Sequence, residues 1–454
     1  MGSGSGCGYC LKDQNINIPD IADVTRELVL SSRATLAFNS PGAEGFGVKR
    51  AGLAIPESVM LIVSPACCGR NTSSISRMEA YRGRYFYLQM DEADLVTGRH
   101  LKLIPRAVEE IVEHLSQRGK TPSIVMVCAT CADALLGTDW VRVLKKAEEK
   151  TGVRVKPCYM YALTREGLHP PMVHVRQSIY SILEKKEKDK QCVNLLGFFA
   201  PVTDDFELYR YLTDAGVQRI NELSRCADFD EFMDMARAGL NIVLNPEARS
   251  AADDLAKKLD IPYVELKRFY DPDRVHRQYQ AFSQAVGIRI DDSEDYEKTL
   301  RLVTAFHERH PSLNVAIGEC VNADPYELAL ALSRRGARVR EIFAPKTEES
   351  RFYIRRLREM GSDARVYVNQ DMAMTEYEPD EEVELAIGKD ACVYHAKTER
   401  GSIRSGQDTD PERGEAPGHC PREETACMEF NTDVQPFGYA GIRQLYAEME
   451  ELSG

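Results

Sequence analysis

Long apolar runs are missing from this sequence. No stretch approaches the ~18 consecutive apolar residues that a membrane-spanning helix requires. The first residues are polar and rich in glycine and serine, unlike a secretory signal peptide. An excess of positive charge is also missing, because 58 Lys and Arg residues stand against 71 Asp and Glu residues and leave a formal net charge of -13. We therefore expect neither a membrane nor a nucleic acid among the partners.

Two familiar site patterns are absent as well. The cysteines contain no CxxC…CxxC pair of the zinc-binding kind. The glycine-rich stretch from Phe38 to Gly52 lacks the Gly-Lys-Ser/Thr ending of a phosphate-binding loop, so it reads as a loop near a partner or a bound group. There are 13 cysteines, an odd number spread over a large chain. This usage argues against a secreted disulfide scaffold and predicts a cytoplasmic protein with reduced thiols.

The chain is long enough for several domains. Its 454 residues correspond to about three domains of ~150 residues each. Apolar runs of strand type alternate with helical patterns along most of the length, which predicts parallel sheets flanked by helices. We expect an α/β protein of three Rossmann-like domains. The predicted divisions are a leader and helix at 1–30, then domains at 31–190, 191–311 and 312–454, the last with a long excursion at 400–424.

A repeat marks the start of the second and third expected domains. Residues 193–197 and 315–318 are both buried-type strands that end in glycine. Each is followed by an acidic helix start, at Asp204 in one case and Asp324 in the other, and by a glycine at the end of that helix. Acidic residues suit a helix amino terminus and glycine suits the position after its end. The repeat therefore predicts two strand–turn–helix units.

Cysteines follow two other strand-like runs. The β-branched run Val59–Val63 leads into Ser64-Pro-Ala-Cys-Cys-Gly-Arg70, and Ile124–Val127 leads into Cys-Ala-Thr-Cys. Ligands of open α/β sheets bind at the carboxyl ends of strands, and thiolates there can hold an iron–sulfur cluster. Ordinary burial is the alternative, because free cysteine is among the most buried residue types. The candidate ligands are Cys67, Cys68, Cys128 and Cys131.

Four stretches together resemble the component 1 proteins of the nitrogenase superfamily. Residues 64–69 and 131–139 look like the second and third cluster-cysteine motifs of that family, and residues 92–103 are similar to the stretch between them. Residues 435–441, Gln-Pro-Phe-Gly-Tyr-Ala-Gly, resemble its carboxyl-terminal signature. The paired cysteines are most like those of the nickel-sirohydrochlorin a,c-diamide reductive cyclase branch.

The resemblance implies an oxidoreductase component that works as a homodimer or a heterotetramer with a similar subunit. Such a component takes electrons from a transiently docked, ATP-hydrolysing iron protein through an interfacial iron–sulfur cluster and passes them to a bound substrate. ATP then binds only to the partner iron protein. Carried over by position, Cys67 and Cys131 are the metal ligands, and Cys68 and Cys128 are alternates or packed neighbours.

Departures from the family pattern refine this expectation. Gly42 stands near the place where the first cluster cysteine of the family belongs. Two cysteines cannot complete a four-iron site, so we expect a 4Fe–4S cluster shared between subunits. The resemblance implies that Asp254 stands in place of the cysteine that holds the nitrogenase molybdenum–iron cofactor, and Phe437 in place of the histidine. Dinitrogen reduction by this chain is therefore not expected.

Proton delivery needs groups near the substrate crevice between the domains. A histidine can pass a proton with each electron near neutral pH. The candidates are His169, His174 and Cys226, each with an ordinary structural role as the alternative. A further set flanks the expected excursion and lacks the tight spacing of a zinc site. Its members are Cys392, His395, His419, Cys420 and Cys427.

Two other functions stay open at this stage. The chain is either a catalytic component, a scaffold on which a metallocofactor is assembled, or the non-substrate-binding subunit of a heteromeric enzyme. The substrate cannot be read from the sequence, since three domains contribute to its pocket.

Overall fold

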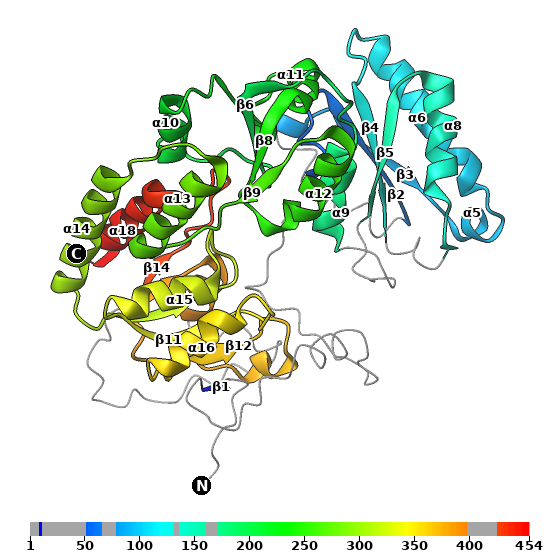
Figure 1. Cartoon of the computed structure of the whole chain (residues 1–454). Helices are drawn as coiled ribbons and strands as arrows, with labels where there is room; N and C mark the ends of the chain where they lie inside the picture. The colour runs from blue at the N-terminus through cyan, green and yellow to red at the C-terminus, as the bar shows by residue number, and fades with distance from the viewer. Residues whose placement is uncertain are drawn as a thin grey trace, which may run out of the picture.

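The computed structural model describes residues 9–10, 51–65, 79–130, 136–159, 170–396 and 425–453. These residues form three sheets, arranged so that the first and third lie at the two ends of the molecule with the second between them (Figure 1). Among the described helices, none is both long and apolar enough to cross a membrane. The expected leader and helix at 1–30, apart from residues 9–10, and the excursion at 400–424 lie outside the described residues.

The first sheet is parallel and has the order β3-β2-β4-β5. Its strands are β2 (Ser58–Ser64), β3 (Tyr85–Gln89), β4 (Ile124–Ala129) and β5 (Arg154–Tyr159). Its helices are α5 (Glu92–Val96), α6 (His100–Ser116), α8 (Trp140–Thr151) and α9 (Pro171–Tyr180). Every residue of β2 and β4 is buried, as their unbroken apolar sequences predict for central parallel strands.

The two faces of this sheet have different covers. On one face, the alternate residues Val59, Leu61 and Val63 pack with residues of α6 and α8. Met60 and Ile62 point the other way, toward α9 and residues of the second sheet. Successive side chains of β2 therefore alternate between two cores. One core lies under helices α6 and α8, and the other lies against α9 and the second sheet.

The second sheet is also parallel, with the order β7-β6-β8-β9. Its strands are β6 (Asp189–Leu196), β7 (Arg219–Glu222), β8 (Ala238–Val243) and β9 (Tyr263–Glu265). Its helices are α10 (Glu207–Asp214), α11 (Phe229–Asp234), α12 (Arg249–Leu259), α13 (Pro272–Val286) and α14 (Ser293–Arg309).

The third sheet has the order β1-β12-β11-β10-β13-β14, and only the β1–β12 pair is antiparallel. Its strands are β1 (Tyr9–Cys10), β10 (Asn314–Ile317), β11 (Arg338–Phe343), β12 (Arg365–Tyr367), β13 (Leu385–Ile387) and β14 (Ala426–Met428). Its helices are α15 (Pro325–Arg334), α16 (Arg351–Glu359), α17 (Lys389–His395) and α18 (Gly438–Ser453). Two parallel sheets and a third that is parallel except for β1, all flanked by helices, confirm the predicted fold class.

The predicted repeat is present, but its two helix starts differ. Asp324 caps α15 by accepting hydrogen bonds from the backbone N–H groups of Tyr326 and Glu327. Asp204 does not cap α10, whose first residue is Glu207; it pairs with Arg225 at 2.7 Å instead. The same sequence pattern therefore has a capping role in only one of the two units.

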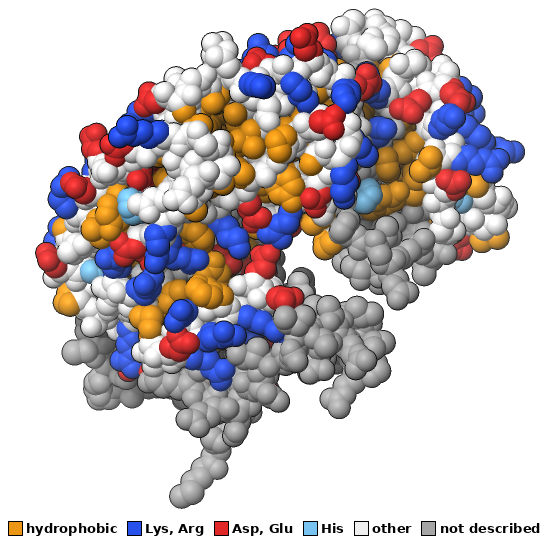
Figure 2. All heavy atoms as spheres, viewed as in Figure 1, with side chains coloured by type: hydrophobic (Ala, Val, Ile, Leu, Met, Phe, Trp, Pro, Cys, Tyr) orange, Lys and Arg blue, Asp and Glu red, His pale blue; other side chains and the backbone are white. Residues whose placement is uncertain are grey.

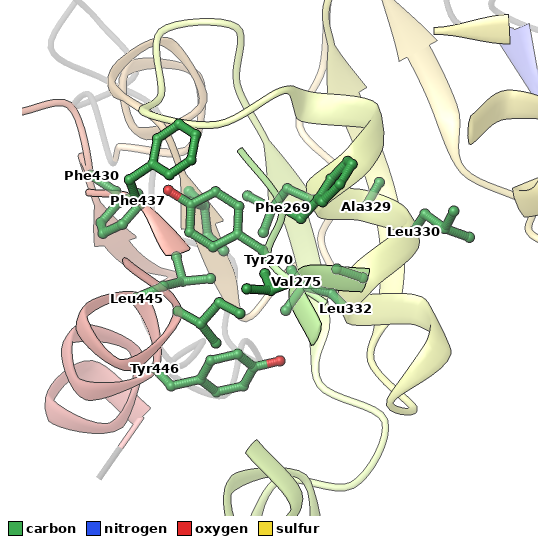
Figure 3. Packing of buried hydrophobic residues seen from close by; sticks show 14 of the residues in the cluster. Phe269, Tyr270, Val275, Ala329, Leu330, Leu332, Phe430, Phe437, Leu445 and Tyr446 are labelled. Atoms are coloured by element: carbon green, nitrogen blue, oxygen red, sulfur yellow. The ribbon is translucent and has the colours of Figure 1, made fainter. Parts of the chain in front are cut away.

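The hydrophobic cores run across the predicted domain boundaries. One core contains residues from Val193 to Met449 and joins the second sheet, the third sheet and α18. Figure 3 shows Tyr270, Phe430 and Phe437 of this core grouped between α18 and the neighbouring helices, with Leu445 and Tyr446 turned inward from α18. The last helix contacts α14, α13 and α10. The exact division at residues 190 and 311 stays a prediction.

Candidate functional site

Two strands that precede the cysteine stretches end side by side. Parallel strands β2 and β4 are neighbours in the first sheet, with Val63 opposite Ala129. The Thr130 hydroxyl donates a hydrogen bond to the carbonyl oxygen of Val63 over 3.4 Å. The chain therefore leaves both strands at the same edge. Cys67, Cys68 and Cys131 lie outside the described residues.

Cys128 lies within β4 and is fully buried. It stands in register with Cys158 of β5, and both thiols belong to the core that contains Met60 and Met126. Burial raises the pKa of Cys158 well above its ordinary value. Cys128 thus occupies the position of a packed neighbour, and a ligand role for it stays a prediction.

His174 lies near the same edge of the first sheet. Its ring makes an edge-to-face contact with Tyr159, the last residue of β5, with 4.6 Å between ring centroids. Tyr159 is opposite Ala129 at the end of β4. A ring nitrogen of His174 also lies 3.3 Å from the Ser178 hydroxyl. The structure therefore brings His174 to the strand end where the cysteine stretches begin, whereas His169 lies outside the described residues.

Cys226 lies elsewhere, beyond the end of the outer strand β7. Its thiol donates to the carbonyl oxygen of Glu222 over 3.3 Å. Burial raises the pKa of this thiol to about 12, and the nearby carboxylates of Glu231 and Asp228 act in the same direction. The thiol is therefore protonated at neutral pH. It lines a pocket on β7, at the opposite edge of the second sheet from β9.

A second pocket lies between the second and third sheets. Its walls come from the chain just after β6, β8, β9 and β10, so the carboxyl ends of four parallel strands meet there. Ligands of open α/β sheets bind at such ends. Figure 2 shows acidic and basic side chains close together over the junction of these two parts of the molecule. The lining includes Phe198, Asn245, Lys267, Arg268, Asp324 and Glu349.

Arg268 has the most unusual environment in this pocket. Its guanidinium donates to Gln435 Oε1 at 2.8 Å and lies over the rings of Phe198 and Phe437, 4.7 and 5.7 Å from their centroids. Burial lowers its pKa, although a guanidinium stays charged in proteins. The buried Nε atom has no hydrogen-bond partner in the described structure. The guanidinium lines the pocket wall, where an anionic or carbonyl group is its natural complement.

Asp254, the expected counterpart of the family's cofactor cysteine, does not line this pocket. It lies on α12 and accepts a hydrogen bond of 2.8 Å from Gln177, beside a different and smaller cavity. Asn245, at the end of β8, lines the pocket instead. Phe437 does lie near the pocket, because its ring flanks Arg268.

No group of three His, Cys, Asp or Glu side chains is placed to hold a metal ion in the portion of the chain that is described. That portion includes Cys392, His395 and Cys427 of the set considered for zinc, while His419 and Cys420 lie outside it.

Sequence comparison decides the family. Residues 44–405 match the family model described as nitrogenase component 1 type oxidoreductase. The match covers most of the chain. This protein belongs to the nitrogenase component 1 type oxidoreductases.

Curated relatives of this component 1 type chain carry two kinds of name. It is 28% identical over 226 residues to the nitrogenase iron-molybdenum cofactor biosynthesis protein NifE of Clostridium pasteurianum, covering 48% of this chain and 47% of the relative. It is 22% identical over 238 residues to the nitrogenase molybdenum-iron protein alpha chain of Methanosarcina barkeri, covering 48% and 44%. The chain therefore matches about half the length of these curated relatives.

A solved structure shares the whole fold. The structure titled "Nitrogenase Cp1 at pH 6.5" has a TM-score of 0.65 at 18% sequence identity, and the match covers 93% of this chain and 94% of that one. At this identity the likeness establishes the arrangement of the three sheets alone.

Sequence reasoning missed Arg268 and Asn245. Both residues follow parallel strands, Asn245 after β8 and Arg268 after β9. Because ligands of open α/β sheets bind at the carboxyl ends of strands, these positions could have been singled out in the same way as the cysteines. The contact between Arg268 and Gln435 joins residues 167 positions apart, and no local pattern announces it.

Proposed function

We propose that this chain is the substrate-binding component of a nitrogenase-like, ATP-dependent reductase. An iron–sulfur cluster at a subunit interface would receive electrons from an ATP-hydrolysing iron protein, and the pocket around Arg268 would hold the substrate. The observation that carries the proposal is the shared edge of β2 and β4, from which both cysteine stretches leave. We expect the assembly in the reducing cytoplasm.

The cluster ligands would be Cys67 and Cys131. Thiolates are the usual protein ligands of such clusters, and the adjacent ends of β2 and β4 allow both stretches to reach one bound group. When bound, the cluster supplies storage and transfer of single electrons. Two ligands per chain require a second subunit for a four-iron cluster, which agrees with a homodimer or a heterotetramer.

The substrate pocket would act through binding and orientation. Arg268, which lines the pocket, would hold an anionic or carbonyl group through its guanidinium, with Gln435 fixing the guanidinium plane. The apolar faces of Phe198 and Phe437 exclude water around that contact and strengthen it. His174, at the carboxyl edge of the first sheet, is the described residue best placed to relay a proton.

Anaerobic purification tests this assignment directly. Iron and sulfide are counted per chain and the mass in solution is measured. One four-iron cluster shared by two chains gives about two iron atoms per chain. Substitutions C67S and C131S should each remove most of the iron, whereas the matched control C158A should retain it, because Cys158 is a buried thiol within the core. The iron content of C128A decides the role of Cys128: retained iron indicates a packed neighbour, and lost iron indicates a ligand. Iron absent from strictly anaerobic protein would refute the proposal.

A scaffold for metallocofactor assembly is the second candidate. It is favoured by the similarity to proteins named for iron-molybdenum cofactor biosynthesis. Turnover of a tetrapyrrole or an organosulfur compound with an iron protein and ATP would support the reductase. Release of an intact metallocofactor to an acceptor protein, without turnover, would support the scaffold. Copurification of a similar subunit that holds the substrate would make this chain the non-substrate-binding partner.

A further inference from the structure

Two cysteines that are distant in sequence meet at the edge of the third sheet. Cys427 belongs to β14, the outermost strand, where it stands opposite Ala386 of β13. Cys392 lies on α17, and its thiol is 3.5 Å from the carbonyl oxygen of the same Ala386. The Cys427 sulfur is 3.9 Å from the carbonyl oxygen of Cys392. Both cysteines therefore lie beside the backbone of Ala386.

The two thiols differ in exposure. Cys427 is exposed on the edge strand, whereas Cys392 is 9% exposed and packs in a core with Phe343 and Met374. A reagent from solvent therefore meets Cys427 first. Cys392 is the less accessible of the two thiols.

Electrostatics reinforces this difference. A hydrogen bond from Cys392 lowers the pKa of the Cys427 thiol, burial opposes this effect, and the charge of nearby His395 adds to the lowering. The hydrogen bond to Cys427 raises the pKa of Cys392, and burial and Glu429 raise it further. His395 is fixed in place, because its Nε2 atom lies 2.8 Å from Glu341 Oε2 in a fully buried pair.

We propose that Cys427 and Cys392 form a reactive thiol pair that reduces low-molecular-weight disulfides and closes into an intramolecular disulfide. The Cys427 thiolate attacks one sulfur of the disulfide RSSR, whose S–S bond breaks and releases one thiolate. Cys392 then attacks the Cys427 sulfur and displaces the second thiolate. The two protons of the cysteines end on the two released thiols. The protein pair loses two electrons, and RSSR gains them to become two RSH. This site is independent of the cluster and of the proposed function.

Peptide mapping tests the pair in the full-length protein. The anaerobically purified chain is incubated with oxidised glutathione, remaining thiols are alkylated, and the protein is digested with trypsin. Each cysteine then lies alone in its peptide, residues 390–397 for Cys392 and residues 423–443 for Cys427. We expect these two peptides to be joined by a disulfide that dithiothreitol removes. A bond from Cys427 to any other cysteine, or between two copies of the chain, would overturn the proposal.

Variants separate the two steps. C392S should stop the reaction at a mixed disulfide, with glutathione attached to Cys427. C427S should leave Cys392 unmodified. Glutathione on Cys392 in C427S would reverse the assigned order and refute it.

The rates of thiol alkylation can be compared in the unaltered protein, so this test does not depend on the folding of a variant. Iodoacetamide should modify Cys427 at least about tenfold faster than Cys226 at pH 7, because reaction rate follows the thiolate fraction and access. Cys226 is the internal comparison, since it is half-buried and its pKa is raised to about 12. Equal rates for the two cysteines would contradict the proposal.

Discussion

Glu207 of α10 caps a helix that begins more than two hundred residues later. Its carboxylate accepts a hydrogen bond of 2.7 Å from the backbone N–H of Tyr439 and another of 3.0 Å from that of Ala440. These N–H groups belong to the first turn of α18, which has no acidic residue of its own there. The Tyr279 hydroxyl donates to the same carboxylate at 2.7 Å. A single buried side chain therefore joins α10, α13 and α18.

Replacement of Glu207 should destabilise the protein. Glu207→Ala leaves three buried donors without an acceptor, which should cost at least about 3 kcal/mol in the free energy of unfolding. Glu207→Gln keeps one acceptor oxygen and should cost about 1–2 kcal/mol. Urea denaturation measures both values. Equal stability of the alanine variant and the unaltered chain would show that the cap contributes nothing.

His307 should make stability depend on pH. Its Nε2 atom lies 2.9 Å from the Tyr446 hydroxyl, so it links α14 to α18. Burial lowers its pKa from 6.5 to about 4, and the charges of Arg335 and His310 add to the lowering. The unfolded chain therefore binds more protons than the folded one between pH 4 and pH 6.5. This contribution to stability is present above pH 6.5 and is lost as the pH falls toward 4.

Comparison with His307→Gln isolates that contribution. Glutamine keeps a polar group near Tyr446 but does not titrate. The urea midpoint, measured at several pH values, should fall less steeply below pH 6.5 in the variant than in the unaltered chain. Two parallel curves would mean that His307 titrates alike in the folded and unfolded states.

Arg274 and Glu327 should show strong coupling. Arg274 Nη1 lies 3.0 Å from Glu327 Oε1, and the Glu327 side chain is 1% exposed. Burial raises the pKa of Glu327 to about 8, while the charge of Arg274 opposes that rise. Arg274→Met should cost about 1–3 kcal/mol, because it leaves a buried carboxyl oxygen of Glu327 without this hydrogen-bond donor. The double variant R274M/E327Q should recover part of the loss, and simple additivity of the two single changes would contradict the coupling.

Arg268 should control ligand affinity in the pocket between the second and third sheets. Arg268→Met removes the guanidinium from the pocket wall and should weaken binding of a carboxylated tetrapyrrole about tenfold or more, since a hydrogen bond to a charged group contributes about 1.5–3 kcal/mol. Lys267→Met is the matched control, because it removes a neighbouring positive charge on the same wall. Absorbance titration measures both affinities. An equal loss in the two variants would indicate general charge attraction rather than a specific contact.

Much of the fold could be predicted because local signals agreed with tertiary structure. The helix at Trp140–Thr151 carries its own start and stop signals, with Asp139 capping its start and Gly152 in the left-handed conformation at its end. The central strands β2 and β4 are buried on both faces and read as unbroken apolar runs. Where a segment carries its own start, stop and apolar pattern, sequence alone locates it.

The missed elements lack such local signals. Strand β7 has the polar sequence Arg-Ile-Asn-Glu, and β13 and β14 have three residues each. These strands exist because neighbouring strands supply their hydrogen bonds. The candidate site shows the same limit. Cysteines at strand ends are visible in the sequence, whereas the environment of Arg268 depends on aromatic rings and an amide brought from other parts of the chain.

The core that reaches from Val193 to Met449 also bears on synthesis of the chain. Chains emerge from the ribosome with their amino-terminal parts first, and domains fold as units when their residues become available. Helices α6 and α8 can cover one face of the first sheet early, since both precede residue 152. The partners of α18 must wait until residues 438–453 have been made. A nascent chain therefore presents the apolar sides of α10, α13 and α14 until α18 emerges.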